Sequence, residues 1–242
     1  MAFIGKKNNF LKFFWKNILD YIFPVICFGC GEEEEEYLCP SCFNKINYFN
    51  DFPCFLCNSG SYEQGICPHC ALETSIDRIF IATSYKENIA GRLVEELKYN
   101  YIEAVVPILG NIIETAIARK KTEKIFTDAV FVPIPLHRKR LAERGFNQAE
   151  LLARALAIKY NGKVNAAALI RHKYTHQQAK LDRQQRLLNV NKSFFVNLEV
   201  SPLEKIILVD DVLTTGTTLR EAAKQLKTVG VKEIVCLAVC HG

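Results

Sequence analysis

The chain has 242 residues, 49% of them hydrophobic and 24% charged, which is the composition of a globular protein with one large or two small domains. No apolar run approaches the roughly 20 residues needed to span a bilayer, so the composition excludes a transmembrane protein. The net charge of +5 is unevenly spread: residues 134–190 hold 12 Lys or Arg against 3 Asp or Glu, which suits a diphosphate or a nucleic-acid backbone.

Residues 1–24 are rich in aromatic side chains and predict an amphipathic helix. Phe10, Phe14, Ile18 and Ile22 fall on one helical face. Charged residues interrupt the apolar run and no small-residue cleavage site follows, which argues against a signal peptide. We expect this helix to dock on the body of the protein; the alternative is a basic helix at a membrane surface.

Four Cys-x-x-Cys pairs come next, within about 45 residues. Each pair can present two thiolates to one metal ion, and two pairs complete a tetrahedral Zn²⁺ site. Residues 25–75 contain little core material, so bound metal would supply the folding free energy that so short a segment lacks. We therefore predict a zinc-binding module with one or two structural Zn²⁺ ions. Its metal ligands are Cys27, Cys30, Cys39, Cys42, Cys54, Cys57, Cys67 and Cys70.

The cysteine pattern leaves several alternatives open. The pairs can combine in sequence order, or interleave as first with third and second with fourth. A disulfide framework needs an oxidising compartment, which is not expected for a chain without a secretory signal. A redox role for one pair is a further alternative, although redox sites usually carry a single pair.

Residues 76–242 alternate predicted strands and helices. This order indicates an α/β fold in which flanking helices cover a parallel-rich sheet. The expected strands are 79–85, 127–132, 166–170, 194–196, 205–209 and 233–239, and the expected helices are 89–99, 102–120, 147–160 and 219–228.

Sheets of this kind bind ligands at the carboxyl ends of their strands, and basic segments lie near such ends. After the second strand, two prolines precede His137 and Arg138, and Arg144 stands before a glycine turn. The polar stretch 171–189 is long for a loop in a compact domain, which predicts a lid over a ligand. A solvated basic surface is the alternative for each segment. The lid residues of interest are Gln178, Arg183 and Arg186.

The most informative segment is 205–218, which joins a strand to a helix. Residues 206–209 are apolar at consecutive positions, so both faces of the strand are expected to be buried. Asp210 and Asp211 follow, and then a loop that contains Gly216 and four threonines. Backbone N–H groups at a helix N-terminus bind phosphate, while two carboxylates can hold a sugar diol, a Mg²⁺ ion or its waters. The segment therefore predicts a phosphorylated sugar as ligand.

This segment is neither a P-loop nor a Gly-x-Gly-x-x-Gly motif. It resembles the 5-phosphoribosyl diphosphate (PRPP) motif of type I phosphoribosyltransferases. The resemblance implies that Asp210 and Asp211 hold the ribose hydroxyls and that the loop after them binds the 5-phosphate. The alternative is an ordinary turn in which one Asp ends the strand and Thr217 caps a helix. The loop residues are Thr214, Thr215, Gly216, Thr217 and Thr218.

The order of motifs is similar to that of the ComF family. The Cys pairs are followed by Leu-Lys-Tyr at 97–99, Pro-Ile-Pro-Leu-His at 133–137, Arg-Gly-Phe-Asn-Gln at 144–148 and the Asp-Asp loop. The resemblance runs from about Pro24 to the C-terminus. It implies a cytoplasmic bacterial protein with a zinc ribbon and a phosphoribosyltransferase-like domain, in a family of which some members serve DNA uptake in natural transformation. Shorter members carry fewer cysteines, so it supports one zinc ion more firmly than two.

An enzyme of this type is a glycosyltransferase that moves the phosphoribosyl group of Mg²⁺-bound PRPP to a nitrogen nucleophile. Such an enzyme mainly positions the leaving diphosphate and neutralises its charge. We expect Asp210, Asp211 and Arg144 to be the catalytic residues. Further contacts to PRPP are expected from Lys98, His137 and Arg138.

Two other functions fit the same residues. The first is a protein that binds single-stranded DNA beside the DNA-uptake machinery, with cations along the phosphates and aromatic side chains stacked on bases. The second is a sensor that binds PRPP without turnover. The aromatics near the Cys pairs are Phe28, Tyr48, Phe49 and Phe55, which can equally form the core of the zinc module.

Overall fold

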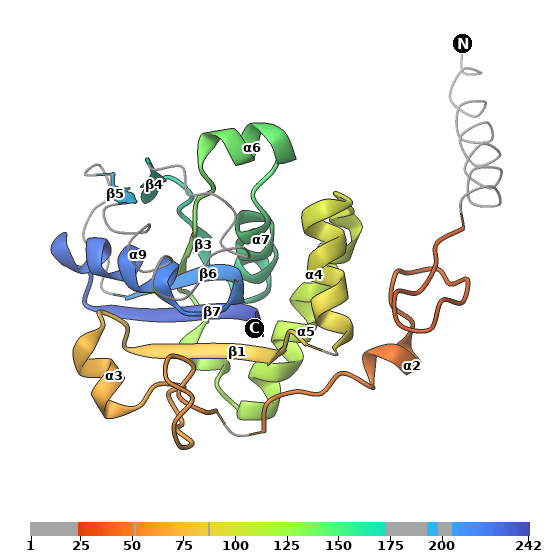
Figure 1. Ribbon diagram of the computed structural model, residues 1–242, viewed down its shortest axis with the longest axis horizontal. Coiled ribbons are helices and arrows are strands. Elements are labelled where there is room, and N and C mark those ends of the chain that lie inside the picture. The colour runs from red at the N-terminus through yellow and green to blue at the C-terminus, as the bar shows by residue number, and fades with distance from the viewer. Residues whose placement is uncertain (1–23, 51, 87, 173–192, 198–204) are drawn as a thin grey trace, which may run out of the picture. The chain divides into compact units, whose positions relative to one another are not determined.

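A computed structural model describes residues 24–50, 52–86, 88–172, 193–197 and 205–242 (Figure 1). The chain divides into two compact units, Met1–Ile46 and Asn47–Gly242. The predicted N-terminal helix, apart from Pro24, lies outside the described residues, as do the predicted lid residues Gln178, Arg183 and Arg186. In the ranges that are described, no helix is both long enough and apolar enough to cross a membrane.

The smaller unit is folded around the first four cysteines. Its one described helix, α2 (Pro40–Phe43), begins directly after Cys39. An antiparallel bridge joins Ile26 to Glu33, and the rings of Phe28 and Tyr37 stack with centroids 5.2 Å apart. The unit buries few large side chains, which agrees with a fold that depends on bound metal.

A five-stranded parallel sheet organises the larger unit, in the order β1-β7-β6-β2-β3. Strand β6 lies in the middle, and its residues Ile206–Val209 are all 0% exposed. The prediction from their consecutive apolar positions is confirmed. The strands are β1 (Arg78–Ser84), β2 (Val130–Pro133), β3 (Lys163–Val164), β6 (Lys205–Leu213) and β7 (Glu233–His241).

Helices flank this sheet (Figure 1). Helices α5 and α7 pack against each other, α5 also contacts β1, and α7 also contacts β2 and β6. The helices are α4 (Ile89–Tyr99), α5 (Val106–Lys120), α6 (Arg138–Arg144), α7 (Gln148–Lys159) and α9 (Thr217–Thr228), with 3₁₀ turns at Glu103–Val105 and Glu123–Ile125. The parallel-rich α/β fold is confirmed.

Three predicted elements differ from the structure. The segments expected as further strands of the parallel sheet form a separate antiparallel pair, β4 (Leu169–Arg171) with β5 (Phe194–Val196). Leu169 is buried while Ile170 is exposed, so β4 has one covered face and not the two that a central parallel strand requires. The fifth strand of the main sheet is instead β3, which is too short to give a pattern. The expected loop after β2 contains α6.

The second group of cysteines belongs to the larger unit. Helix α3 (Pro68–Glu73) begins after Cys67. The backbone nearby is bonded into the sheet, because the N–H of Ile79 in β1 donates to the carbonyl of Gln64 at 2.8 Å. The boundary between the two units therefore falls inside the segment 25–75, which the sequence presents as one module.

Candidate functional site

Strand β6 does not stop at the two aspartates but continues through them to Leu213, and the chain then turns into α9. Gly216 precedes the first helical residue with a φ of +69°, a left-handed conformation that glycine adopts without strain. Glycine has no side chain with which to cap the helix, so backbone N–H groups at the start of α9 remain donors for an anion. The hydroxyl oxygens of Thr215 and Thr217 lie 2.8 Å apart beside them.

The two aspartates differ in their surroundings. Asp211 is only 3% exposed, and its Oδ1 lies 2.9 Å from Nζ of Lys98, which comes from α4. Its Oδ2 is buried and has no hydrogen-bond partner among the described residues. Because an unsatisfied buried oxygen is costly, this atom marks a place where a bound hydroxyl or cation would add a missing interaction.

The carboxyl group of Asp210 has a raised pKa. Burial and the neighbouring negative charge of Asp211 raise the pKa of Asp210 to about 7, although the cation of Lys98 opposes the shift. One Asp210 oxygen accepts a hydrogen bond of 2.9 Å from the backbone N–H of Asp211. A ligand cation would reverse this shift, because it favours the charged form.

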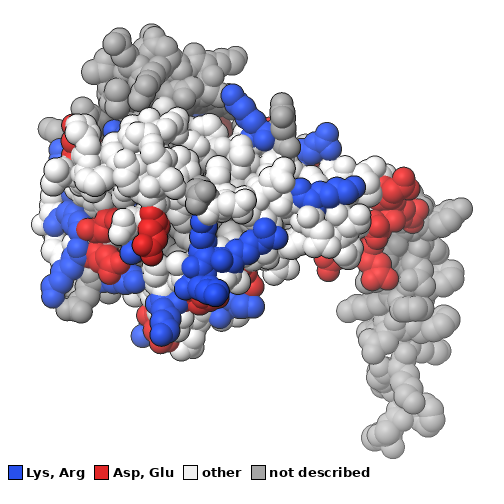
Figure 2. All heavy atoms as spheres, turned by 90° about the horizontal axis from the view of Figure 1, so that it is seen from below, with Lys and Arg blue, Asp and Glu red and all other residues white. Residues whose placement is uncertain are grey.

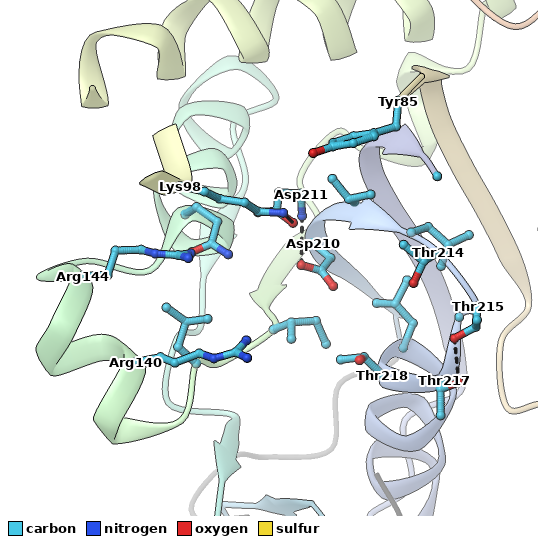
Figure 3. A pocket seen from close by; sticks show the side chains of 18 of the residues that line it. Tyr85, Lys98, Arg140, Arg144, Asp210, Asp211, Thr214, Thr215, Thr217 and Thr218 are labelled. Carbon is cyan, nitrogen blue, oxygen red and sulfur yellow. Dashed lines mark hydrogen bonds and ion pairs between the residues drawn. The ribbon is translucent and has the colours of Figure 1, made fainter. Parts of the chain in front are cut away.

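Both aspartates line a cavity of about 730 Å³ at the carboxyl edge of the sheet. In Figure 3, Lys98, Arg140 and Arg144 lie on one side of this cavity and the threonine loop lies on the other, with the aspartates between them. The cavity thus has cationic side chains, a basic wall, on one side and hydroxyl and backbone N–H donors on the other. The two carboxylates lie between them. Such a cavity can hold a molecule with one phosphate, a diol and a second anionic group.

The basic side of the cavity comes from three segments, of which α4 supplies Lys98. Arg140 and Arg144 stand on α6, which ends at Gly145 with a φ of +83°. The guanidinium of Arg144 donates to Oε1 of Gln148, the first residue of α7. Arg171 in β4 also lines the cavity; burial lowers the pKa of its guanidinium, and the charge of Asp210 opposes that shift.

Most of the site residues expected from the sequence line this cavity, but His137 and Arg138 are not among its described lining residues. His137 instead caps α6, with its Nδ1 accepting a 3.2 Å hydrogen bond from the backbone N–H of Lys139. The expected residues that line the cavity are Lys98, Arg144, Asp210, Asp211, Thr214, Thr215, Gly216, Thr217 and Thr218.

Sequence reasoning missed several residues of the cavity wall. Tyr85 follows β1, and its hydroxyl donates to Glu95 at 2.8 Å. Tyr101 follows α4 with a φ of +58°, and its ring meets that of Phe146 edge-on. The end of β1 was a usable signal for Tyr85, because parallel strands end at the same edge. No pattern pointed to Tyr101, since its position depends on an unusual backbone angle.

The eight cysteines form two clusters in sequence order, and no interleaving occurs. Cys27, Cys30, Cys39 and Cys42 form one cluster, and Cys54, Cys57, Cys67 and Cys70 the other, with all sulfurs of a cluster within 4.8 Å of one another. None of these cysteines is in a disulfide. The two Cys₄ clusters fit structural zinc, so the residues present suit two ions.

Backbone N–H groups support the thiolates, as a metal site requires. In the first cluster, Cys27 Sγ accepts from the backbone N–H of Cys39 at 3.3 Å. In the second, Cys67 Sγ accepts from the N–H of Cys70 at 3.3 Å. Hydrogen bonds from the hydroxyl and the backbone of Ser59 lower the pKa of the Cys57 thiol to about 6.

Two known domain families match parts of this chain. Residues 18–71 match the double zinc ribbon domain, and residues 140–242 match the phosphoribosyl transferase domain. The second match includes the threonine loop and both aspartates. It does not include Lys98 and Tyr85, which come from the preceding β1–α4 region.

Similar proteins carry names that refer to competence or to DNA. Competence protein F of Haemophilus influenzae is 33% identical over 219 residues, which cover 87% of this chain and 93% of the relative. The DNA utilization protein YhgH of Escherichia coli K12 is 25% identical over 206 residues, or 78% of this chain and 89% of the relative. Competence protein ComFC of Streptococcus pneumoniae is 33% identical over 111 residues, or 46% and 47%.

Proposed function

The chain belongs to the competence protein F (ComF) family, and from this premise we propose that it binds Mg²⁺-PRPP at the Asp-Asp loop and transfers the phosphoribosyl group to a nitrogen nucleophile. The observation that carries the proposal is the position of Asp210 and Asp211 between two walls that each attract anions. An activated ribose phosphate presents a phosphate, a diol and a diphosphate in that order.

Each part of PRPP has a counterpart in the cavity. The backbone N–H groups and hydroxyls of Thr214–Thr218 would hold the 5-phosphate. Asp210 and Asp211 would accept hydrogen bonds from the two ribose hydroxyls, and their oxygens also suit Mg²⁺ or its waters. Arg140 and Arg144, which line the opposite wall, would hold the diphosphate.

In the transfer, the bond from ribose C1 to the diphosphate oxygen breaks and its electron pair leaves with the diphosphate. A bond from C1 to the acceptor nitrogen forms, and the proton that this nitrogen loses passes to water. Bound Mg²⁺ would supply charge neutralisation for the diphosphate. The protein's own cations would stabilise the leaving group, where negative charge increases in the transition state. Lys98 must change its partner for this purpose, because in the free protein its ammonium is paired with Asp211.

Binding is tested by the effect of Mg²⁺-PRPP on thermal unfolding. A ligand at 100 times its Kd stabilises the native state by about 2.7 kcal/mol, which is a readily measured rise in the unfolding temperature. Asp210→Ala should abolish the rise. Glu63→Ala, at an exposed position away from this cavity, should retain it. An Asp210→Ala protein that is stabilised as much as the wild type would remove Asp210 from the site.

Turnover is tested separately, by diphosphate release from PRPP with a panel of nitrogenous acceptors. Release that depends on an acceptor and is lost in Arg144→Ala supports the transferase. Binding of PRPP without release under any acceptor would identify a sensor of PRPP and contradict the transfer step.

The relatives' names refer to competence and to DNA utilization. As a second candidate function we propose that the protein binds single-stranded DNA in the cytoplasm with the DNA-uptake machinery. The structure reduces the support for base stacking near the second cluster, because Phe55 is 1% exposed and packs against Phe49 and Phe52. On the face of the larger unit seen in Figure 2, Lys and Arg stand among Asp and Glu and do not form a continuous basic surface. Affinity for an oligonucleotide that falls steeply with salt would support this function, and salt-insensitive or absent binding would contradict it.

A further inference from the structure

The second cysteine cluster contacts the threonine loop directly. Leu56 lies between the ligand residues Cys54 and Cys57, and it is 7% exposed. Its side chain is packed against the backbone of Gly216: a Cβ added to that glycine would come within 2.5 Å of Leu56 Cδ2. Gly216 is the residue at which the loop turns into α9. The Cys54–Cys57 segment, called the knuckle below, therefore touches the loop at this turn.

Phe55, the neighbouring residue of the knuckle, contacts the strand beside the start of the loop. Phe55 packs its ring against His241 with centroids 5.3 Å apart, and its carbonyl oxygen lies 3.2 Å from His241 Nε2. His241 ends β7 and is the register partner of Leu213, the last residue of β6 before the loop. Of two successive residues between two zinc ligands, Leu56 therefore contacts the loop at Gly216, and Phe55 contacts His241, the strand partner of the residue before the loop.

Metal binding would determine how firmly these contacts are held. Cys54 and Cys57 fix the ends of the knuckle when four thiolates share one ion, and the residues between them are then restricted in backbone conformation. The knuckle is also joined to the sheet, because Phe55 N–H donates to the carbonyl of Gly65 at 3.0 Å, beside the bond from Ile79 to Gln64. An added Cβ at Gly65 would meet the carbonyl oxygen of Ile79 at 2.1 Å, so the residue that accepts the Phe55 hydrogen bond lies close against β1.

We propose that the Cys54–Cys57 knuckle is part of the phosphate site: with metal in the second cluster, Leu56 at Gly216 and Phe55 through His241 hold the threonine loop in the conformation that binds a phosphate ester. Leu56 is a positioning residue in this arrangement, because it acts through Gly216 and does not line the cavity. The inference rests on the proposed function for the identity of the ligand, but the positioning itself does not need PRPP.

The chain offers matched controls in the smaller unit. Leu38 is buried, 4% exposed, and precedes the ligand Cys39, so Leu38→Ala makes the same truncation beside the first cluster. Cys30 and Cys57 are the exposed ligands of the two clusters, so Cys30→Ser and Cys57→Ser remove equivalent ligands. Leu56→Met keeps most of the side-chain volume and serves as the conservative variant.

The first measurement is amide hydrogen–deuterium exchange of the peptide that spans residues 213–219, together with zinc content, on the full chain without PRPP. Leu56→Ala and Cys57→Ser should exchange this peptide at least tenfold faster than the wild type, and Leu38→Ala, Cys30→Ser and Leu56→Met should not. Zinc content should fall from two to one in both serine variants only. Unchanged exchange in Leu56→Ala, or equal acceleration by the Leu38 and Leu56 truncations, would overturn the proposal.

The second measurement is the Kd for Mg²⁺-PRPP by calorimetry, at a temperature well below the unfolding midpoint of every variant. Leu56→Ala should bind about tenfold more weakly, which corresponds to about 1.4 kcal/mol, with two zinc ions retained. Leu56→Met should restore the affinity. Absence of binding by the wild type would contradict the proposed function alone, because the exchange measurement still decides whether the knuckle holds the loop.

Discussion

The two cysteine clusters have the same local design and different surroundings. In each, the second cysteine is exposed and the other three are buried, and a Cys-Pro step starts a short helix. The first cluster is the centre of a separate small unit. The second is joined to β1, to β7 and to the glycine of the threonine loop. The comparison shows that the Cys-x-x-Cys pattern specifies the metal site, whereas the residues between the ligands determine what the site supports.

The largest expected difference between the clusters is in stability. Cys54→Ser and Cys27→Ser each remove a buried first ligand. Because structural zinc supplies folding free energy to the segment that binds it, Cys54→Ser should lower the free energy of unfolding of the larger unit by roughly 3 kcal/mol or more. Cys27→Ser should leave that transition within about 0.5 kcal/mol, since the first cluster lies in the other compact unit. Calorimetry with zinc analysis measures both; equal losses would show that the comparison is wrong.

A pair of glycines sharpens the comparison. Gly31 and Gly216 both have left-handed φ values, +82° and +69°, but an added Cβ meets nothing within 4 Å at Gly31 and meets Leu56 at 2.5 Å at Gly216. Gly31→Ala should therefore cost only the backbone strain, about 1 kcal/mol, and Gly216→Ala roughly 3 kcal/mol through strain and overpacking.

Urea unfolding of each unit, followed by its own probe, tests the two values. Leu56→Ala in the Gly216→Ala background should recover part of the lost stability, because it removes the Leu56 side-chain atoms that the added Cβ would contact. A double variant no more stable than Gly216→Ala alone would mean that backbone strain, and not the knuckle, sets the cost.

A smaller expected difference is that the stability of the larger unit depends on pH through Asp210. Burial and the charge of Asp211 raise the pKa of Asp210 in the folded protein to about 7, above its value in the unfolded chain. The folded state then binds more protons than the unfolded state between about pH 4 and pH 7, so the stability of the larger unit falls as pH rises through that range. Asp210→Asn removes this loss and should stabilise the larger unit at pH 8, with zinc bound and without Mg²⁺, by roughly 1–2 kcal/mol.

Denaturant unfolding at pH 5 and pH 8 measures this effect. Lys98→Met supplies a second variant of opposite sign, because the lysine cation lowers the pKa of Asp210. Loss of the Lys98 cation should make the stability of the larger unit fall more steeply between pH 5 and pH 8. Parallel pH profiles for wild type and Asp210→Asn would contradict the assignment to Asp210.

The sequence predicted the central parts of the molecule well because their signals are local. Helix α4 has the predicted bounds, Ile89–Tyr99, and β6 contains the predicted run of four apolar residues. The predicted zinc ligands form two complete clusters for the same reason, since each Cys-x-x-Cys pair lies in a single turn. The family and the α/β fold were also recognisable from the order of motifs.

The predictions were weaker where residues from different segments meet. The position of β4 outside the main sheet and the presence of α6 depend on which faces are covered, and a short segment does not carry that information. His137 was expected to contact PRPP, but its imidazole caps α6, whereas Arg140, three residues later, lines the cavity. Successive side chains on a helix point about 100° apart. A cluster of cations in the sequence therefore predicts a basic surface without saying which cation faces the cavity.

The sequence by itself determined the parts whose chemistry lies within one turn or one strand: the metal ligands, the buried central strand and the acidic pair ahead of a glycine-threonine turn. Only the tertiary structure decided that the second metal cluster touches that turn, that Lys98 from a distant helix neutralises Asp211, and that Tyr85 and Arg171 share the same cavity. The physical reason is that contacts between distant segments depend on how whole elements pack, and packing is a property of complementary surfaces that no single stretch of sequence contains.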